Sequence, residues 1–178
     1  MGFAKRLFLT LGMIGFLSSS VTATAVAAGN TVKLSGTRFE MEVPKDWAPG
    51  YKDLDDKLLM IYFTSAQTGT TLEGVYLRKV QPATYTMADF IKFRIGAENK
   101  RYEGKNHKVI KESGLTIGGE KGGYLLTTWT DGGKVFEKHT ALFLKDGRQY
   151  LVVLHGPQGK VDKAIFDHAV ASFGLGKE

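Results

Sequence analysis

The sequence contains no cysteine. A chain without thiols tolerates an oxidising compartment, but no disulfide can stabilise it there. The same absence removes the thiol that would carry an acyl anchor, so we expect no lipid attachment, and it excludes cysteine-ligated zinc. No apolar run after the first 28 residues is long enough to span a bilayer. We therefore expect a domain that is stabilised by its hydrophobic core alone.

The N-terminus has the layout of an export signal. Lys5 and Arg6 precede an apolar run over residues 7–17, and small residues follow over residues 18–28. This order is typical of a secretory signal peptide. A membrane-spanning helix needs roughly 20 apolar residues, more than this run provides. We predict a cleavable signal peptide over residues 1–28 and a periplasmic or secreted product without a stable membrane anchor; an uncleaved N-terminal anchor is the alternative.

Size and charge then limit the remaining chain. About 150 residues are left, which is the common size of a single domain, so we predict one domain over residues 29–178. The formal net charge falls from +6 to +4 when the two signal cations are removed. The densest cations, Lys100, Arg101, Lys105 and Lys108, form no stripe with interleaved aromatic residues, so we expect no nucleic-acid partner.

The rest of the chain has mostly strand patterns. Residues 37–43 alternate strictly and place Phe39, Met41 and Val43 on one face, as in a half-buried strand. Residues 58–63 and 150–154 are apolar on both faces, which indicates interior strands. Asp146-Gly147 is a typical tight hairpin turn. The remaining predicted strands are residues 70–80, 124–130 and 134–144.

Two segments have helical periodicity. Thr86 can cap the first, with Asp89 reaching back to complete the cap, and an apolar stripe runs on to about Glu98. The second covers residues 161–173, with Gly174 as its expected C-cap. Strands that are apolar on both faces need cover on both sides. The predicted fold class is α+β, an antiparallel β-sheet sandwiched by helices.

A family resemblance follows from this order of elements. The mature segment opens with Phe39-x-Met41-x-Val43-Pro44-x-Asp46-Trp47, continues through a central helix and a hairpin meander, and ends in Ala171-Ser172-Phe173. This resembles the PsbP-like fold family, which includes photosystem II extrinsic proteins, DcrB-type envelope proteins and a eukaryotic Ran-binding regulator. The resemblance implies an α/β/α sandwich and an accessory or binding role without enzyme activity, and it transfers no site residue.

Two departures from the family stand out. DcrB-type proteins are commonly anchored through a lipidated cysteine, and this chain has none. Nothing in the sequence marks a photosynthetic lumen, so the resemblance does not extend to a role in oxygen evolution.

Motifs for catalysis are missing. The four histidines, His107, His139, His155 and His168, form no zinc-binding spacing. His139 shares a predicted strand face with Glu137, which favours a partly buried or cross-strand histidine over a catalyst. Ser113 lacks the flanking glycines of a nucleophile elbow.

The glycine-rich residues 118–123 lie between predicted strands, so we interpret them as a hairpin connection rather than a phosphate cradle, with a mobile functional loop as the alternative. We assign no catalytic, cofactor-binding or metal residue.

One segment is a candidate partner-binding edge. Acidic residues follow two aromatic residues closely in a stretch that we expect to be irregular, and aromatic residues beside charge are common at interfaces. Trp47 has a second interpretation, as a lid on the core, and the acids have a second one, as a solvated loop. The residues of this candidate edge are Trp47, Tyr51, Asp53, Asp55 and Asp56.

The leading hypothesis is an exported, non-enzymatic binding or accessory protein that contacts another envelope protein or an envelope component. One alternative is an enzyme with a non-motif active site, which a deep cleft joining His139 or His155 to a carboxylate would favour. The other is a small-ligand or lipid carrier with an apolar cavity between sheet and helix.

Overall fold

The computed structural model describes residues 30–33, 39–54, 57–117 and 120–175. The predicted signal peptide lies outside them and stays a prediction. The elements in chain order are β1 (Asn30–Lys33), β2 (Phe39–Val43), β3 (Ala48–Leu54), β4 (Leu58–Thr64), β5 (Thr71–Leu77), α1 (Met87–Arg101), β6 (Lys108–Ile117), β7 (Glu120–Asp131), β8 (Lys134–Lys145), β9 (Arg148–Pro157), α2 (Lys163–Ser172) and β10 (Gly174–Leu175).

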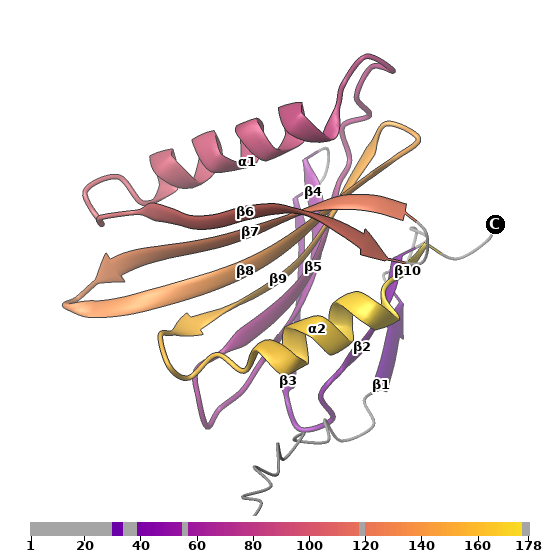
Figure 1. Cartoon of the computed structure of the whole chain (residues 1–178). Coiled ribbons are helices and arrows are strands. Elements are labelled where there is room, and N and C mark those ends of the chain that lie inside the picture. Colours follow the sequence, from indigo (N-terminus) through magenta and orange to yellow (C-terminus); the bar gives the residue numbers. More distant parts are fainter. Residues whose placement is uncertain (1–29, 34–38, 55–56, 118–119, 176–178) are drawn as a thin grey trace, which may run out of the picture.

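Seven strands form the main sheet, in the order β3-β4-β5-β9-β8-β7-β6 with every neighbouring pair antiparallel (Figure 1). The predicted interior strand at 150–154 is confirmed, because β9 lies in the middle and Leu151, Val152 and Leu154 are at most 1% exposed. Successive side chains of a strand point to opposite faces. The centre of the sheet therefore needs cover on both sides.

Helix α1 covers one face. Its predicted start is confirmed: the Thr86 hydroxyl accepts a hydrogen bond from the Asp89 N–H, and the Asp89 carboxylate accepts one from the Thr86 N–H. Phe90 points into the core and is fully buried. The helix packs on β7 and β8. Neither α1 nor any other helix among the described residues is long and apolar enough to cross a membrane.

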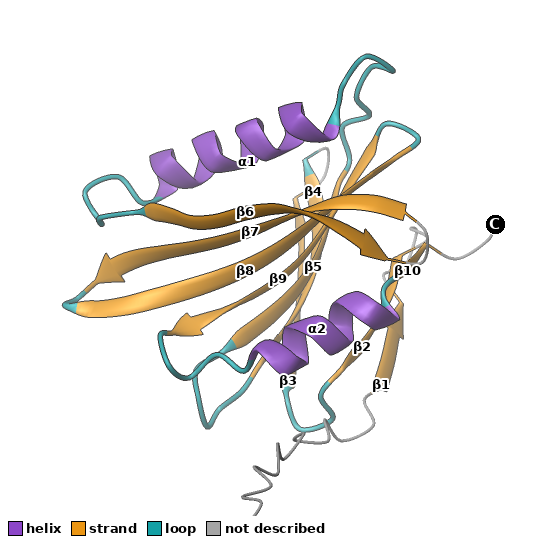
Figure 2. Ribbon diagram, viewed as in Figure 1, coloured by secondary structure: helices purple, strands orange, loops and turns teal. Residues whose placement is uncertain are grey.

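Helix α2 and a second, smaller sheet cover the opposite face (Figure 2). This sheet has the order β1-β2-β10. The alternation predicted for residues 37–43 is confirmed over β2, where Phe39 and Met41 are 1% exposed. Their side chains lie against β5 at Gly74, where an added Cβ would come within 2.5 Å of the Phe39 ring. The α+β fold with cover on both faces is thus confirmed, although β2 belongs to the cover and not to the main sheet.

The hairpin turn before β9 has the conformation predicted from the sequence, but the end of α2 differs from the prediction. Asp146 and Gly147 have φ of 51° and 69°, the left-handed conformation expected of this dipeptide in a hairpin. Helix α2 is capped at its C-terminus by Phe173, not Gly174. Gly174 instead pairs with Glu40 as the first residue of β10, so the chain leaves the helix directly into the small sheet. Strands lie on both sides of the predicted glycine-rich connection, as expected, but the connection is shorter than residues 118–123: β7 begins at Glu120, and Gly122 and Gly123 pair with β6. Residues 118–119 lie outside the described ranges.

The Gly147 turn gives a test of this packing. Gly147 and Gly159 both have positive φ, 69° and 78°, so alanine costs about 1 kcal/mol at each. At Gly147 the new Cβ would also lie 2.6 Å from the Gln81 carbonyl oxygen, whereas open space surrounds Gly159. In urea unfolding, Gly147→Ala is expected to lower the free energy of unfolding by about 1 kcal/mol more than Gly159→Ala does. Equal losses would contradict the close approach of Gln81.

Candidate functional site

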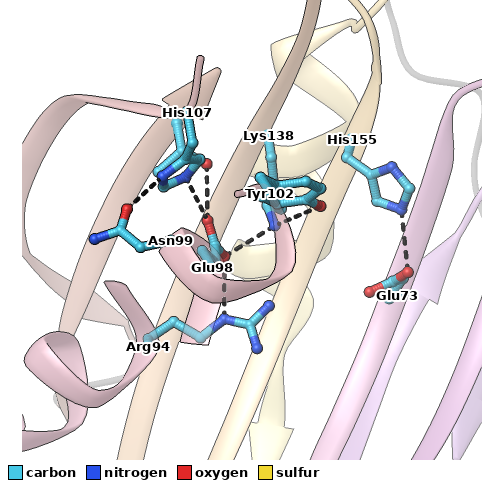
Figure 3. A network of polar contacts seen from close by, with 9 residues as sticks. Glu73, Arg94, Glu98, Asn99, Tyr102, His107, Lys138 and His155 are labelled. Carbon is cyan, nitrogen blue, oxygen red and sulfur yellow. Dashed lines mark hydrogen bonds and ion pairs between the residues drawn. The ribbon is translucent and has the colours of Figure 1, made fainter. Parts of the chain in front are cut away.

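Helix α1 carries an acidic residue, Glu98, on the side that faces the sheet (Figure 3). Its Oε1 lies 3.1 Å from Arg94 Nε and 2.9 Å from Lys138 Nζ. Its Oε2 accepts a hydrogen bond of 3.0 Å from the Thr127 hydroxyl and lies 3.3 Å from His107 Nε2. Groups from α1, β7, β8 and the segment between α1 and β6 therefore converge on one carboxylate.

Lys138 of β8 is the buried cation of this network. Its side chain is 2% exposed, and Nζ donates a 3.2 Å hydrogen bond to the Tyr102 hydroxyl. The ammonium also lies 4.8 Å from the Tyr102 ring centroid and 5.5 Å from that of Trp129. Aromatic faces attract a cation more strongly when water is excluded. The charge of Lys138 is therefore balanced by one carboxylate and two aromatic rings.

A stack of rings closes the network on one side. Tyr102 stacks on Trp129 with 4.4 Å between centroids, and Trp129 stacks on Phe136 at 5.3 Å. His107 stacks on Tyr102, and its Nδ1 lies 2.7 Å from the Asn99 amide oxygen. The chain reverses after α1 through two positive-φ residues, at 104 and 106, and this turn brings His107 back over the helix end. Local backbone geometry thus positions the histidine.

The electrostatics follow from burial. Desolvation opposes the charge of Glu98, but Lys138, Arg94 and the hydrogen bonds outweigh it and lower the pKa of this carboxyl. Desolvation is the largest effect on Lys138 as well, and it lowers the pKa of the amine to about 8 although Glu98 acts in the other direction. Both groups are therefore charged at pH 7.

A second histidine–carboxylate pair lies beside the network on the same face of the sheet. His155 Nε2 of β9 is 3.1 Å from Glu73 Oε1 of β5, and the two side chains are 29% and 21% exposed. Burial opposes the charge of Glu73, but the hydrogen bond and charge of His155, together with Lys138, lower its pKa. Figure 3 shows this pair next to Lys138. It is the more accessible part of the region.

The buried part of the network is suited to holding α1 on the sheet. Glu98 and Lys138 are 1% and 2% exposed, so a solute could reach them only if α1 moved. Sequence reasoning did not identify these residues. One signal was present: Glu98 lies three residues beyond Ile95 on the apolar stripe of α1, and an acid at such a position needs a buried partner.

The other two histidines also have partners. His139 is 6% exposed, and its Nδ1 lies 2.8 Å from the Tyr124 hydroxyl of the neighbouring strand, which confirms the expected buried, cross-strand histidine. His168 Nε2 of α2 lies 2.7 Å from Glu42 Oε2. Ser172 is one turn away, but its hydroxyl donates to the Ala169 carbonyl and not to His168, so it is not activated as a nucleophile. Within the described ranges, no group of three or more histidine or acidic residues is placed to hold a metal ion.

Most of the candidate partner-binding segment lies in the edge strand of the main sheet. The segment expected to be irregular forms strand β3, because it pairs with β4 along its whole length. Tyr51 is 59% exposed, and its hydroxyl lies 3.5 Å from Asp53 Oδ2. Arg78 reaches across from the end of β5 to Asp53, with 2.8 Å between Nη2 and Oδ1. Trp47 lies just before β3 and packs against the core, and Asp55 and Asp56 lie outside the described residues.

A groove lies on the opposite side of the molecule from α1, between α2 and the other end of the sheet. Its volume is about 540 Å³, and β6, β7 and α2 all line it. Tyr124 and Phe166 form its aromatic part, with ring centroids 5.9 Å apart. Lys111 of β6 and Lys163 of α2 stand on its two sides. Sequence reasoning named an apolar cavity between sheet and helix only as part of the carrier alternative and identified none of these lining residues, since α2 is distant in the chain from β6 and β7.

Two solved structures resemble this fold closely over most of their length. PsbP of the cyanobacterium Synechocystis sp. PCC 6803 (CyanoP) matches with a TM-score of 0.66 and 16% identity, over 92% of this chain and 99% of that one. The Ran-binding protein Mog1p of Saccharomyces cerevisiae matches with a TM-score of 0.61 and 10% identity, over 83% and 95%. No family model matches the sequence, and neither does any curated protein sequence. The chain has the PsbP-like fold, as the resemblance implied.

The buried ion pair predicts a stability effect. Lys138→Met removes the closest cation from Glu98 and leaves the carboxylate in a desolvated site, which costs about 3 kcal/mol. The double variant Glu98→Gln/Lys138→Met removes both charges and is expected to recover part of that loss. Lys145→Met is the control, because Lys145 pairs with Glu120 at the surface and such pairs contribute less than about 1 kcal/mol. Similar losses in urea unfolding for both single lysine variants would contradict the network.

The lowered pKa of Glu98 predicts how stability changes with pH. The unfolded carboxyl, with an ordinary pKa of 4.5, takes up its proton before the folded one as the pH falls. The stability that Glu98 contributes is complete above this pH and is lost as the pH falls through the folded value. The difference in free energy of unfolding between wild type and Glu98→Gln is therefore expected to shrink between pH 7 and pH 3. A difference that stays constant would show that the carboxylate charge contributes nothing.

Proposed function

We propose that this chain is an exported, non-enzymatic binding or accessory protein of the cell envelope, and that it contacts a partner protein through the edge at β3. The observation that carries the proposal is the exposure of β3. Six of its seven residues are exposed, and two of these are large and apolar, Tyr51 at 59% and Leu54 at 38%. Aromatic residues are enriched at the centres of interfaces, and polar groups surround them at the rim.

The edge is held in a fixed shape. Arg78 pairs with both oxygens of Asp53, and the Tyr51 hydroxyl lies beside the same carboxylate. A side chain that is already ordered loses less entropy when a partner binds. Pro49 lies within the strand and cannot donate a backbone hydrogen bond, which discourages simple strand addition at this edge. Contact through side chains is therefore the mode that we propose.

The comparisons support a binding role by analogy. The yeast protein with this fold is named as Ran-binding, so the same architecture can serve protein recognition. Fold alone does not fix function, because unrelated activities occur on one architecture. For this chain the analogy adds to the exposed β3 surface and does not replace it.

An enzymatic role is the weaker hypothesis. The most open histidine–carboxylate pair is His155–Glu73, which is 29% and 21% exposed. The groove beside α2 is lined by neither residue, nor are the hollows around Phe93 and Ile110. A general acid or base must lie within hydrogen-bonding reach of a bound substrate. The exposed β3 surface therefore favours binding over catalysis.

The test is crosslinking in the native envelope fraction followed by affinity purification. The wild type is expected to retain one stoichiometric partner, and Tyr51→Ser is expected to reduce its recovery about tenfold or more, as for an aromatic residue at an interface centre. Phe93→Ser is the matched control, since Phe93 is 55% exposed on the outer side of α1. The proposal fails if no partner is recovered, or if both substitutions reduce recovery equally.

A further inference from the structure

The groove between α2 and β6 is a second surface that the proposed partner contact does not use. Three elements line it: Lys111 and residues 113–116 of β6, Tyr124 of β7, and one side of α2. Its volume of about 540 Å³ falls within the range of roughly 300–1,000 Å³ that is typical of small-molecule sites.

The floor is apolar and largely aromatic. Tyr124, Phe166 and Val170 belong to the core cluster on this side of the sheet, and each still lines the groove. The room above them exists because β6 contributes a small side chain here, since Ser113 is the residue that pairs with Tyr124. A larger side chain at position 113 would fill the space over the Tyr124 ring.

The polar groups of the floor are already satisfied. The Tyr124 hydroxyl is 2.8 Å from His139 Nδ1, and both residues are less than 10% exposed. Burial raises the pKa of Tyr124, with Asp167 and Glu137 acting in the same direction, so the phenol stays neutral at pH 7. Burial likewise lowers the pKa of His139. The floor therefore offers a ligand an apolar, uncharged surface.

The rim carries one cation, Lys111, that has no acidic partner among the described residues. Lys163 is neutralised by Asp167, with 2.6 Å between Nζ and Oδ1. Lys111 forms no ion pair with any described residue, and its ammonium lies 5.9 Å from the Tyr124 ring centroid. Within the part of the chain that the structure describes, the groove thus combines an apolar floor with a single uncompensated positive charge at its edge. A ligand that matches it has an apolar body and one negative charge.

A peptide strand fits the site less well. Edge strands that accept an added strand present a regular, unblocked backbone. Strand β6 instead has a register shift between Val109 and Lys111. Its N-terminal half also carries three charged residues, Lys108, Lys111 and Glu112. Bulges and charges are the features that protect a sheet edge from strand addition.

We propose that this groove binds a small amphipathic carboxylate, with its alkyl or aryl body on Tyr124 and Phe166 and its carboxylate at the Lys111 ammonium. A monoanion is favoured over a dianionic phosphate, because Lys111 supplies one positive charge and no second free cation lines the groove among the described residues. The site is separate from the β3 edge, so either proposal can fail without affecting the other.

The test is an NMR titration of the purified, isotope-labelled protein with octanoate, with octan-1-ol and octyl phosphate as comparison probes. Octanoate is expected to shift the amide signals of residues 111–116, of Tyr124 and of the groove side of α2. Lys111→Gln is expected to weaken octanoate binding about threefold, the size of an exposed charge contact, and to leave octan-1-ol binding unchanged. Lys108→Gln is the matched control: it removes a charge from the same strand outside the groove and should change neither affinity.

Two further variants test the location. Ser113→Phe fills the groove from β6 and Ala171→Phe fills it from α2, so each is expected to abolish octanoate binding while the amide spectrum stays that of a folded protein. The proposal is overturned if millimolar octanoate shifts no groove amide, or if Lys111→Gln weakens octanoate and octan-1-ol equally. It is also overturned if neither filling variant reduces binding, or if octyl phosphate binds the wild type more tightly than octanoate.

Discussion

Both faces of strand β9 are buried, and the rest of the architecture depends on this constraint, because each face of the central sheet must be covered. Its residues 149–154 are all buried, so apolar side chains point to both sides of the main sheet. An antiparallel sheet can leave one face wet only when its strands alternate. Here both faces must be covered. Helix α1, with Phe90, covers one face, and α2 together with the small sheet covers the other.

The two covers are attached by different physics. On the α2 side, Phe39 lies in the space that Gly74 leaves open and Phe173 packs at 4.3 Å on Phe143, so the attachment is apolar. On the α1 side the helix stripe is continued by Glu98, and a buried ion pair with Lys138 replaces apolar contact at the helix end. Such pairs contribute little net stability, but they discriminate strongly against a helix that is shifted in register, because the charge would then be buried without a partner. The network therefore defines where α1 lies on β7 and β8.

Sequence reasoning succeeded where a feature depends on residues close together in the chain and failed where it depends on residues far apart. The Thr86–Asp89 cap and the Asp146-Gly147 turn depend on residues a few positions apart, and both were predicted. The pairing of β2 with β10, and the approach of α2 to β6 and β7 at the groove, depend on segments that are distant in the chain, and no local pattern contains that information. Strand β3 was missed for a different reason: as an edge strand with mostly exposed residues, it has no apolar alternation to detect.

Because both faces of the main sheet are covered, its two edges, at β3 and β6, are the parts of the sheet that other molecules can reach without disturbing the core. At one end, β3 presents Tyr51 beside a fixed carboxylate. At the other edge, β6 places the small Ser113 opposite Tyr124, which leaves room for the groove beside α2. The polar contacts described above lie away from both of these edges: Glu98 joins α1 to Lys138 of β8, His155 joins β9 to Glu73 of β5 within the main sheet, and His168 joins α2 to Glu42 of β2 within the other cover. The buried Glu98–Lys138 pair thus holds α1 on the sheet, and the two accessible edges are the surfaces on which both proposals rest.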